Sequence, residues 1–485
     1  MSTKVAPTAC NRRVNENVGR GDSRVAGVLL VIVAVGAGFR LWRLGSSRLN
    51  YDEAFTAMAG RLPFGAMVKH LRLGDSHPPL DYLVRAPLAR AGVSEAFVRL
   101  PSAVCSIAAL ALFAWWMRGR GRVGVFATVM MALAVFQIAH GREARMYAEL
   151  ELIGIAAAMI VDAWLREPRQ WHAPLAGFLT ALALFTHASG MLLAAGLLFV
   201  AGRRTDREAW LWRAAVGLAA SVWVGLWGSA FLFQAHGGHS QWIPRSTVSG
   251  AVSVVGSLVA PAGAAEVGLV VAIFAGGVIL FRRDRVLART WISCFALPVA
   301  LAIGFGRFSP VLLDRTLTLF AWGAPFAVAV VLDAVTPRTT ASFLLVFAVV
   351  VAVMTPGAVI TANATSGPTA ALTRLAAVAR PGDIVAIEPI SKQVELAWSL
   401  GVRSRHGSTR PVRLDIARSP ALELTAAPRS GRVWLLNFDG TRPGPASPPR
   451  CAPDWFSAPY RIECLRLGSR LPSSGRPVVL SARPT

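Results

Sequence analysis

The sequence predicts an all-α polytopic membrane protein of about eleven transmembrane helices, followed by a small extracytoplasmic α/β domain. Three observations support this fold class. The 485 residues are 54% apolar and only 16% charged, and the apolar residues form long blocks, as in proteins with many membrane helices. The short segments between the blocks are rich in arginine, as the positive-inside rule expects. Residues 361–485 are instead polar and rich in Pro, Arg and Ser.

The net charge and the cysteine spacing bear on nucleic-acid binding, zinc binding and disulfide formation. A formal net charge of +24 could indicate nucleic-acid binding, but arginines in short loops between apolar blocks are better explained by membrane topology. No cysteine spacing is typical of a zinc site. Only Cys451 and Cys464 share a polar segment. We predict a disulfide between them, because that segment is expected in an oxidising compartment.

The chain begins with a polar, basic stretch over residues 1–23, which we expect to be a disordered cytoplasmic tail. The apolar span 24–44 is too long for the apolar h-region of a signal peptide and lacks a small-residue cleavage pattern, so we expect a retained anchor. The first outer loop, 45–98, contains two expected interfacial helices, Asp52 to Leu62 and Pro79 to Ala91. Further spans are expected at 99–117, 123–140, 147–165, 172–187, 189–202, 211–233, 264–281, 290–306, 316–333 and 341–360.

Alternation of these spans places the basic loops inside and the C-terminal domain outside. The apolar block 172–202 is split at Thr186-His187, because a single span there would invert the later loops and place Arg282-Arg283 outside. A second outer segment, 234–263, ends in a mildly apolar helix. The inner loops are 118–122, 166–169, 203–207 and 282–285.

Residues 24–360 therefore form the predicted transmembrane domain, and residues 361–485 form a separate small domain. In the small domain, Ser391 to Leu400 is an expected helix. The expected strands are Asp383 to Glu388, Arg432 to Phe438 and Arg476 to Ser481. No phosphate-binding glycine loop is present.

Two adjacent carboxylates, Asp52 and Glu53, follow the first span and stand next to Tyr51. Acidic residues are common in the first turn of a helix, where they complement the helix dipole, so a structural role would explain them. Adjacent helical residues point about 100° apart, however. One carboxylate could therefore act as a base while the other holds the structure or a substrate hydroxyl.

The same loop continues with Asp75-Ser76-His77-Pro78-Pro79-Leu80 and then Asp81-Tyr82. The double proline fixes an extended stretch and orients the residues before it. His77 could bind a phosphate, a hydroxyl or a metal. Alternatively, the prolines only turn the chain towards the following helix.

Charged residues recur at the outer end of the third span. Arg142 and Arg145 are three residues apart, so on one helical face they could clamp an anion; the alternative is an Arg–Glu pair that locks two helix ends. Glu149 and Glu151 could pair with these arginines or line a polar cavity. Asp314-Arg315 is a second, weaker candidate, because charges at membrane depth are costly unless they are paired or functional.

Three histidines, His187, His236 and His239, could be metal ligands. Such residues are more often ordinary polar groups of loops, and we assign no metal ligand.

Together these residues resemble the polytopic C-class (GT-C) glycosyltransferases that use polyprenyl-phosphate sugars. This group includes the bacterial relatives of protein O-mannosyltransferases and of the lipid A aminoarabinose transferase. The similarity covers about residues 24–335 and departs at Thr316, where relatives often carry an aromatic residue after the arginine. The matching pieces, in the family's order, are Asp52-Glu53, His77-Pro78-Pro79-Leu80, Arg142-Glu143-Ala144-Arg145-Met146-Tyr147, Gln241-Trp242-Ile243-Pro244 and Asp314-Arg315 before a span containing Pro325.

The resemblance implies a GT-C fold and an inverting transfer of a sugar, such as mannose or a pentose like arabinose. The donor would be a polyprenyl-phosphate sugar, and the acceptor a hydroxyl of a glycan, lipid or protein outside the plasma membrane. The chemistry fits the residues, because a hydroxyl needs a general base and a leaving phosphate needs positive charge. The implied roles are catalytic for Asp52, the general base, and Glu53; donor phosphate-binding for Arg142, Arg145 and Arg315; and substrate-binding for Tyr51, His77, Asp81 and Tyr147.

A transporter or flippase of lipid-linked substrates would also explain charges within the membrane. Transporters usually show inverted repeats and broken helices near the midplane, and the sequence indicates neither. A non-catalytic scaffold on the same fold is a third alternative. No nucleic-acid partner is expected, and a divalent metal remains possible as a cofactor.

Overall fold

The computed structural model describes residues 9–75, 77–91, 94–202, 204–236, 243–260, 265–309, 311–364, 384–388, 431–437, 450–457 and 460–467. The chain divides into two compact units. The predicted division placed the whole loop 45–98 with the membrane domain, whereas two parts of it group with the C-terminal residues. The first unit comprises Met1–Arg43, Phe64–Val84 and Arg99–Ala364, and the second comprises Leu44–Pro63, Arg85–Val98 and Thr365–Thr485.

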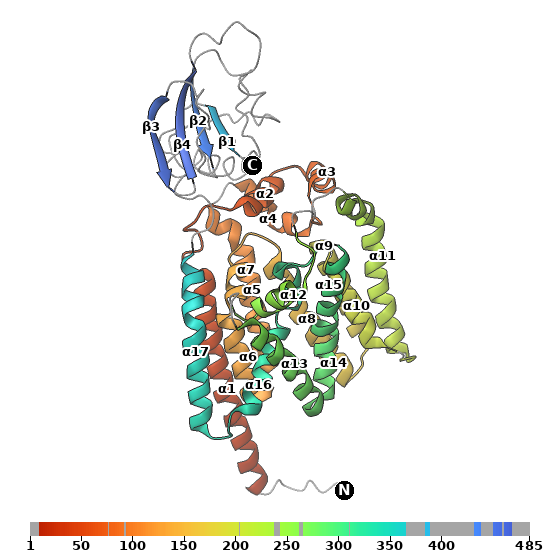
Figure 1. The fold of residues 1–485 in the computed structure, drawn as a ribbon. Helices are drawn as coiled ribbons and strands as arrows, with labels where there is room; N and C mark the ends of the chain where they lie inside the picture. Colours follow the sequence, from red (N-terminus) through yellow and green to blue (C-terminus); the bar gives the residue numbers. More distant parts are fainter. Residues whose placement is uncertain are drawn as a thin grey trace. The chain divides into compact units, whose positions relative to one another are not determined.

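The first unit is a bundle of helices (Figure 1). Apolar helices occur at every predicted span, but the span 123–140 is broken at the extended residue Ala134. In chain order, the helices of the bundle are first α1 (Ala9–Leu41), α3 (Phe64–Gly74), α5 (Glu95–Met117), η1 (Arg118–Arg120), α6 (Gly121–Leu133), α7 (Val135–Gly141), α8 (Tyr147–Arg166), α9 (His172–Thr186), α10 (Gly190–Ala201) and α11 (Arg207–His236). They are followed by α12 (Val248–Ser257), α13 (Glu266–Arg283), α14 (Arg285–Trp291), η2 (Ile292–Ala296), α15 (Leu297–Phe308), η3 (Asp314–Phe320), α16 (Gly323–Val335) and α17 (Thr340–Asn363).

Several of these helices have the length and composition of membrane spans. Within the described ranges, four stretches qualify, namely Glu95–Leu133, Arg207–Ala235, Arg285–Phe308 and Thr340–Asn363. A fifth is formed if η3 and α16, which are bent by 68° at their junction, count as one broken span. The chain is therefore a multi-pass membrane protein, while the count of eleven spans remains a prediction.

The basic loops lie together at one end of the bundle. Arg120 and Arg166 each lie 3.0 Å from the carboxylate of Asp162 in α8, and Arg166 also lies 3.1 Å from Asp284, which follows α13. Arg204 lies over the ring of a buried tryptophan near the end of α8. These contacts agree with the predicted order of the helices. The block 172–202 is divided at the predicted place, because α9 ends at Thr186 and α10 begins at Gly190; that each helix crosses the membrane stays a prediction.

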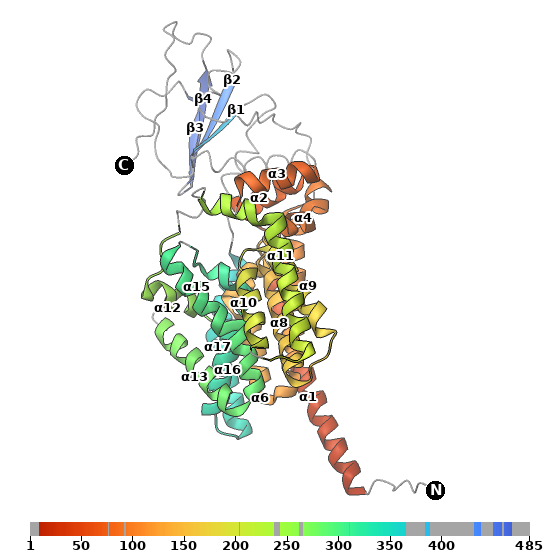
Figure 2. The ribbon, with the colours of Figure 1, turned by 90° about the vertical axis from the view of Figure 1, so that its right-hand side faces the viewer.

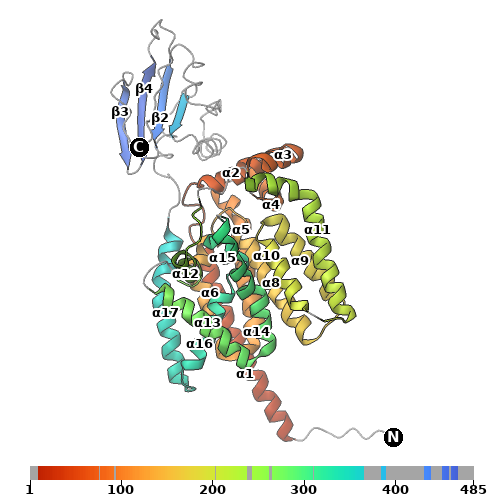
Figure 3. The ribbon, with the colours of Figure 1, turned by 45° about the vertical axis from the view of Figure 1, so that its right-hand side comes forward.

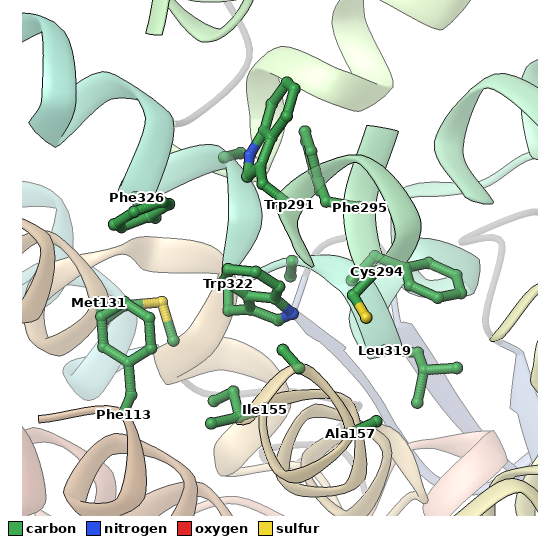
Figure 4. Close-up of a cluster of buried hydrophobic side chains, with 14 of the residues drawn as sticks. Phe113, Met131, Ile155, Ala157, Trp291, Cys294, Phe295, Leu319, Trp322 and Phe326 are labelled. Atoms are coloured by element: carbon green, nitrogen blue, oxygen red, sulfur yellow. The ribbon is translucent and has the colours of Figure 1, made fainter. Parts of the chain in front are cut away.

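Close helix packing fills the interior of the bundle. In Figure 4, Trp322 lies among aromatic and aliphatic side chains from α5, α6, α8 and α14, and Trp291 donates a hydrogen bond to the carbonyl of Gly323 (2.9 Å). A Cβ added at Gly154 would overlap the backbone carbonyl of Leu319. Lipid tails are as apolar as side chains, so close contact at small residues holds such helices together. Figure 2 shows α9 and α11 packed side by side in this bundle.

The outer segments form short helices. In the first outer loop, α2 (Tyr51–Gly60) and α4 (Leu80–Ala91) match the two predicted helices within two residues, whereas α3 was not predicted. Arg72 and Gln234 join α3 to α11 through hydrogen bonds of 2.7 and 2.9 Å to backbone carbonyls. Figure 3 shows these two helices next to each other. The predicted helix of the second outer segment is α12.

The second unit contains a four-stranded mixed sheet in the order β1-β2-β4-β3. Its β1 and β2 are parallel, and the other pairs are antiparallel. β1 and β2 confirm two predicted strands, while the predicted helix 391–400 and strand 476–481 lie outside the residues that the structure describes. The strands are β1 (Ile384–Glu388), β2 (Gly431–Asn437), β3 (Arg450–Ser457) and β4 (Tyr460–Leu467).

Candidate functional site

The carboxylate pair begins α2, and its two members differ in local role. The side chain of Asn50 accepts a hydrogen bond from the backbone N–H of Glu53 (2.9 Å), and the Glu53 carboxylate accepts one from the backbone N–H of Asn50 (2.9 Å). This reciprocal arrangement is a capping box, and Glu53 is buried in it. Asp52 takes no part in the capping box, and its side chain is half-buried. The ring of Tyr51 lies 6.4 Å from that of Phe55.

Arginines fix the parts of the first outer loop that belong to the second unit. Arg90 donates hydrogen bonds to the carbonyls of Gly60 (3.1 Å) and Leu62 (2.7 Å), at the end of α2. Arg61 donates in return to the carbonyl of Ala89 in α4 (3.1 Å). The end of α2 and the second half of α4 are therefore joined through backbone carbonyls, which cations near helix ends satisfy well.

A polar cluster joins the His77 loop to the segment before α8. The carboxylate of Asp75 accepts a hydrogen bond from the Tyr82 hydroxyl and lies 3.2 Å from Nδ1 of His77. Arg145 is buried, with its guanidinium 3.4 Å from Nδ1 of His77 and 3.5 Å from the Tyr82 oxygen. The ring of His187 lies 5.3 Å from that of His77. We call Asp75, His77, Tyr82, Arg145 and His187 the polar cluster.

Burial and neighbouring charges shift the pKa values of Asp75, Tyr82 and His187 in the polar cluster. Burial opposes ionisation of Asp75, but His77 and Arg145 outweigh burial and hold the pKa of Asp75 well below its usual range. Burial, together with the charge of Asp75, raises the pKa of Tyr82 well above its usual value. Burial, and then the positive charges of His77, Arg145 and Arg315, lower the pKa of His187. The cluster therefore holds a carboxylate, a neutral phenol and a neutral histidine around Arg145.

The arginine pair does not lie on one helical face, as the predicted clamp assumed. Residues 142–146 form a turn between α7 and α8 rather than one helical face, so the spacing argument was wrong. Arg142 instead donates to the carbonyls of Phe39 (3.0 Å), Trp42 and Ala362 (2.8 Å), at the ends of α1 and α17. The guanidinium of Arg142 thus joins the ends of α1 and α17, while that of Arg145 belongs to the polar cluster.

The remaining predicted residues lie in three settings. Asp81 is buried in the first turn of α4. Tyr147 is buried at the start of α8, with its ring 4.7 Å from that of His140. Arg315 is the second residue of η3, where its backbone N–H donates to the Asp314 carboxylate (2.7 Å). Arg315 belongs with the polar cluster electrostatically, because its charge acts on His187.

A second buried charge lies deeper in the bundle. Arg40 of α1 is fully buried and donates to Ser106 of α5 (2.7 Å) and to the carbonyl of Ala132 in α6 (3.2 Å). Glu151 of α8 is also buried, and Arg40 is the arginine whose charge acts on it. The expected pairing of Glu151 with Arg142 or Arg145 is therefore replaced by an interaction with Arg40.

The part of the chain that the structure describes contains no group of three or more His, Cys, Asp or Glu side chains able to hold a metal ion. His187 packs against His77 and accepts a hydrogen bond from the Ser189 backbone N–H (3.0 Å). His239, the side chain of His236 and the matched residues 241–242 lie outside the described part.

Sequence reasoning missed Asp75 and Tyr82 as site residues and assigned His187 only a weak metal role. Asp75 stands two residues before His77 and Tyr82 stands five after it, so proximity to His77 was an available signal. His187 is 110 positions further along the chain than His77, and only the fold brings the two rings together.

The fold is similar to solved structures of membrane glycosyltransferases. ArnT from Cupriavidus metallidurans in the apo state matches with a TM-score of 0.58 at 14% identity, over 91% of this chain and 98% of that chain. The same protein bound to undecaprenyl phosphate matches with a TM-score of 0.56 at 14% identity, over 91% and 97%. An Archaeoglobus fulgidus oligosaccharyltransferase in complex with Zn and sulfate matches with a TM-score of 0.50 at 11% identity, over 84% and 67%. No family model and no curated protein matches the sequence. These similarities confirm the predicted GT-C fold.

Proposed function

From this GT-C fold, we propose that the protein is a membrane glycosyltransferase that moves a sugar from a polyprenyl-phosphate donor to an acceptor hydroxyl. The observation that carries the proposal is the buried Arg145, which the polar cluster holds at the end of the bundle opposite the basic loops. Arg145 contributes a guanidinium to this cluster, and the charge of Arg315 also acts on it. Two arginines at this depth suit a phosphate.

A lipid-linked donor is supported by the similarity to ArnT, whose structure contains undecaprenyl phosphate. Such a donor needs no nucleotide-binding loop, and the sequence has none. We propose mannose or a pentose such as arabinose as the sugar, transferred on the extracytoplasmic face of the plasma membrane.

The proposed mechanism divides the chemistry between two groups. Asp52 removes the proton of the acceptor hydroxyl as its oxygen attacks the anomeric carbon. The bond from that carbon to the phosphate oxygen breaks with inversion, and the lipid phosphate leaves with an additional negative charge. Arg145, assisted by Arg315, stabilises this charge. Glu53 supports the reaction indirectly, because its carboxylate fixes the start of α2 through the capping box.

One observation favours the alternative of a transporter or flippase. The sequence indicated no broken helix, but η3 and α16 are bent by 68° at their junction. Broken helices of this kind line substrate sites in transporters. The two functions differ in their products, because only a transferase cleaves the donor.

Turnover of radiolabelled polyprenyl-phosphate sugars by membranes that contain the protein tests the proposal. The wild type should release lipid phosphate and label an acceptor, and Arg145→Ala should abolish both. Arg169→Ala is the matched control, because Arg169 is exposed beyond the opposite end of α8 and pairs with Glu167. Movement of intact donor across the bilayer without cleavage would establish the transporter instead.

A further inference from the structure

We propose that Asp75 is a specificity-determining residue of the donor site, because its carboxylate weakens the binding of a doubly charged lipid phosphate more than that of a singly charged phosphodiester. The inference rests on the proposed function, in which Arg145 holds the donor phosphate. It distinguishes the two lipids that such a site meets. The donor is a phosphodiester with one negative charge, whereas the released lipid phosphate is a monoester that carries close to two charges above about pH 7.

Asp75 lies beside Arg145 because the two side chains share neighbours. The Asp75 carboxylate accepts a hydrogen bond from the Tyr82 hydroxyl, and the oxygen of that hydroxyl lies 3.5 Å from the guanidinium of Arg145. Nδ1 of His77 lies 3.2 Å from the same carboxylate and 3.4 Å from the same guanidinium. A neutral imidazole with its proton on Nδ1 can donate to the carboxylate. Two side chains therefore hold the carboxylate close to the guanidinium.

The Asp75 carboxylate keeps its negative charge at neutral pH. Burial opposes its ionisation, but His77, Arg145 and the hydrogen bond from Tyr82 outweigh burial and hold the pKa of Asp75 well below its usual range. Hydrogen bonds donated to a carboxylate favour its charged form. A phosphate bound at Arg145 would therefore lie near a fixed negative charge as well as near the guanidinium.

Other charged groups also act on the polar cluster. Arg315 acts on His187 from η3, and Arg145 acts on both His187 and Asp75. A second carboxylate, that of Asp81, acts on Tyr82. These groups set the background potential of the site, and the variants that change Asp75 leave them in place. A change in binding that depends on the charge of the ligand can therefore be assigned to Asp75.

The effect of the fixed charge of Asp75 depends on the charge of the ligand. The electrostatic energy of an anion in the site is, to a first approximation, its own charge multiplied by the local potential. Arg145 makes this potential more positive, and Asp75 makes it less positive. A dianion therefore loses about twice as much binding energy through Asp75 as a monoanion does. The carboxylate limits the retention of the lipid phosphate product while the phosphodiester donor still binds.

Calorimetry on the full-length protein in detergent at about pH 8 tests this inference with two probes. One probe is a short polyprenyl methyl phosphodiester, and the other is the corresponding polyprenyl monophosphate, which is a dianion at that pH. The measured quantity is the ratio of the two affinities. Asp75→Asn removes the charge at nearly constant shape, and it should shift this ratio towards the monophosphate by roughly threefold or more.

A purely structural role of Asp75 predicts a different result. If the carboxylate only held Arg145 in place, Asp75→Asn would weaken the binding of both probes by the same factor. Tyr82→Phe removes a hydrogen bond to Asp75 but keeps its charge, so this variant should retain the wild-type ratio. Asp206→Asn is the matched control, because it removes a carboxylate that pairs with Arg204 in the loop after α10; both of its affinities should equal those of the wild type.

The outcomes separate this inference from the donor site itself. If Arg145→Ala binds both probes as well as the wild type does, the donor site is wrong. If Arg145→Ala loses both probes but Asp75→Asn keeps the wild-type ratio, the donor site stands and the discrimination is refuted. Asp75→Ser is a second neutral variant, for the case in which Asp75→Asn binds neither probe. Loss of both probes in both neutral variants would make Asp75 a structural support of the site and overturn the inference.

Discussion

Replacing Arg142 with Ala is expected to destabilise the helix bundle without weakening the binding of lipid phosphate. Its guanidinium donates to carbonyls of Phe39 and Trp42 near the end of α1 and of Ala362 near the end of α17. The last carbonyls of a helix have no partner within it, and they attract cations. Hydrogen bonds from charged groups contribute about 1.5–3 kcal/mol each, but several from one half-buried side chain are not additive. We therefore expect a total loss of about 2–4 kcal/mol.

Thermal unfolding in detergent, followed by tryptophan fluorescence, measures this loss as a lower Tm. Arg142→Lys is the matched variant, because it keeps the charge but loses the planar fork that reaches several carbonyls; its Tm should lie between those of Arg142→Ala and the wild type. Calorimetry with a short polyprenyl methyl phosphodiester as the probe should give both variants the wild-type affinity. An unchanged Tm combined with weaker probe binding would refute the argument and return Arg142 to the donor site.

Three further predictions concern other parts of the chain. Asp52→Asn should reduce turnover by roughly a hundredfold or more at an unchanged Tm, whereas Glu53→Ala should lower the Tm through a loss of about 1 kcal/mol of capping; a larger turnover loss in Glu53→Gln than in Asp52→Asn would transfer the base role. Gly154→Leu should prevent folding, because a side chain there meets the backbone of η3; a normal Tm would contradict the packing argument. Cys451 and Cys464 lie on paired strands and should resist alkylation without reductant; mass spectrometry that finds two labelled thiols would exclude the disulfide.

The helices were predictable because long apolar blocks and basic loops are local signals. The break between α6 and α7 was not, because Ala134 carries no signal that a helix ends there, unlike glycine or proline. β3 was missed because it contains Pro453, and proline argues against a strand unless the strand is irregular. β3 is irregular in this sense, since it pairs with β4 through register shifts.

The polar cluster was only partly predictable. His77 and Arg145 were found from local motifs, but their contact joins residues 68 positions apart. No periodic pattern connects them to His187, which a turn between two short helices brings to the same place. The error at Arg142 has a similar origin, because helical spacing was assumed where the chain forms a turn.

In the pairs Asp52–Glu53 and Arg142–Arg145, the hydrogen-bond partners of each residue indicate whether it acts in folding or in binding. Glu53 and Arg142 bind backbone groups at helix ends, and these contacts stabilise the ends of the helices. Arg145 instead contacts the side chains of His77 and Tyr82, and side chains can turn aside when a ligand arrives. A charged residue with backbone partners is therefore best tested for stability, and one with side-chain partners for binding. Applied to the Asp52–Glu53 pair, this criterion assigns Glu53 to the fold and leaves Asp52 as the proposed base.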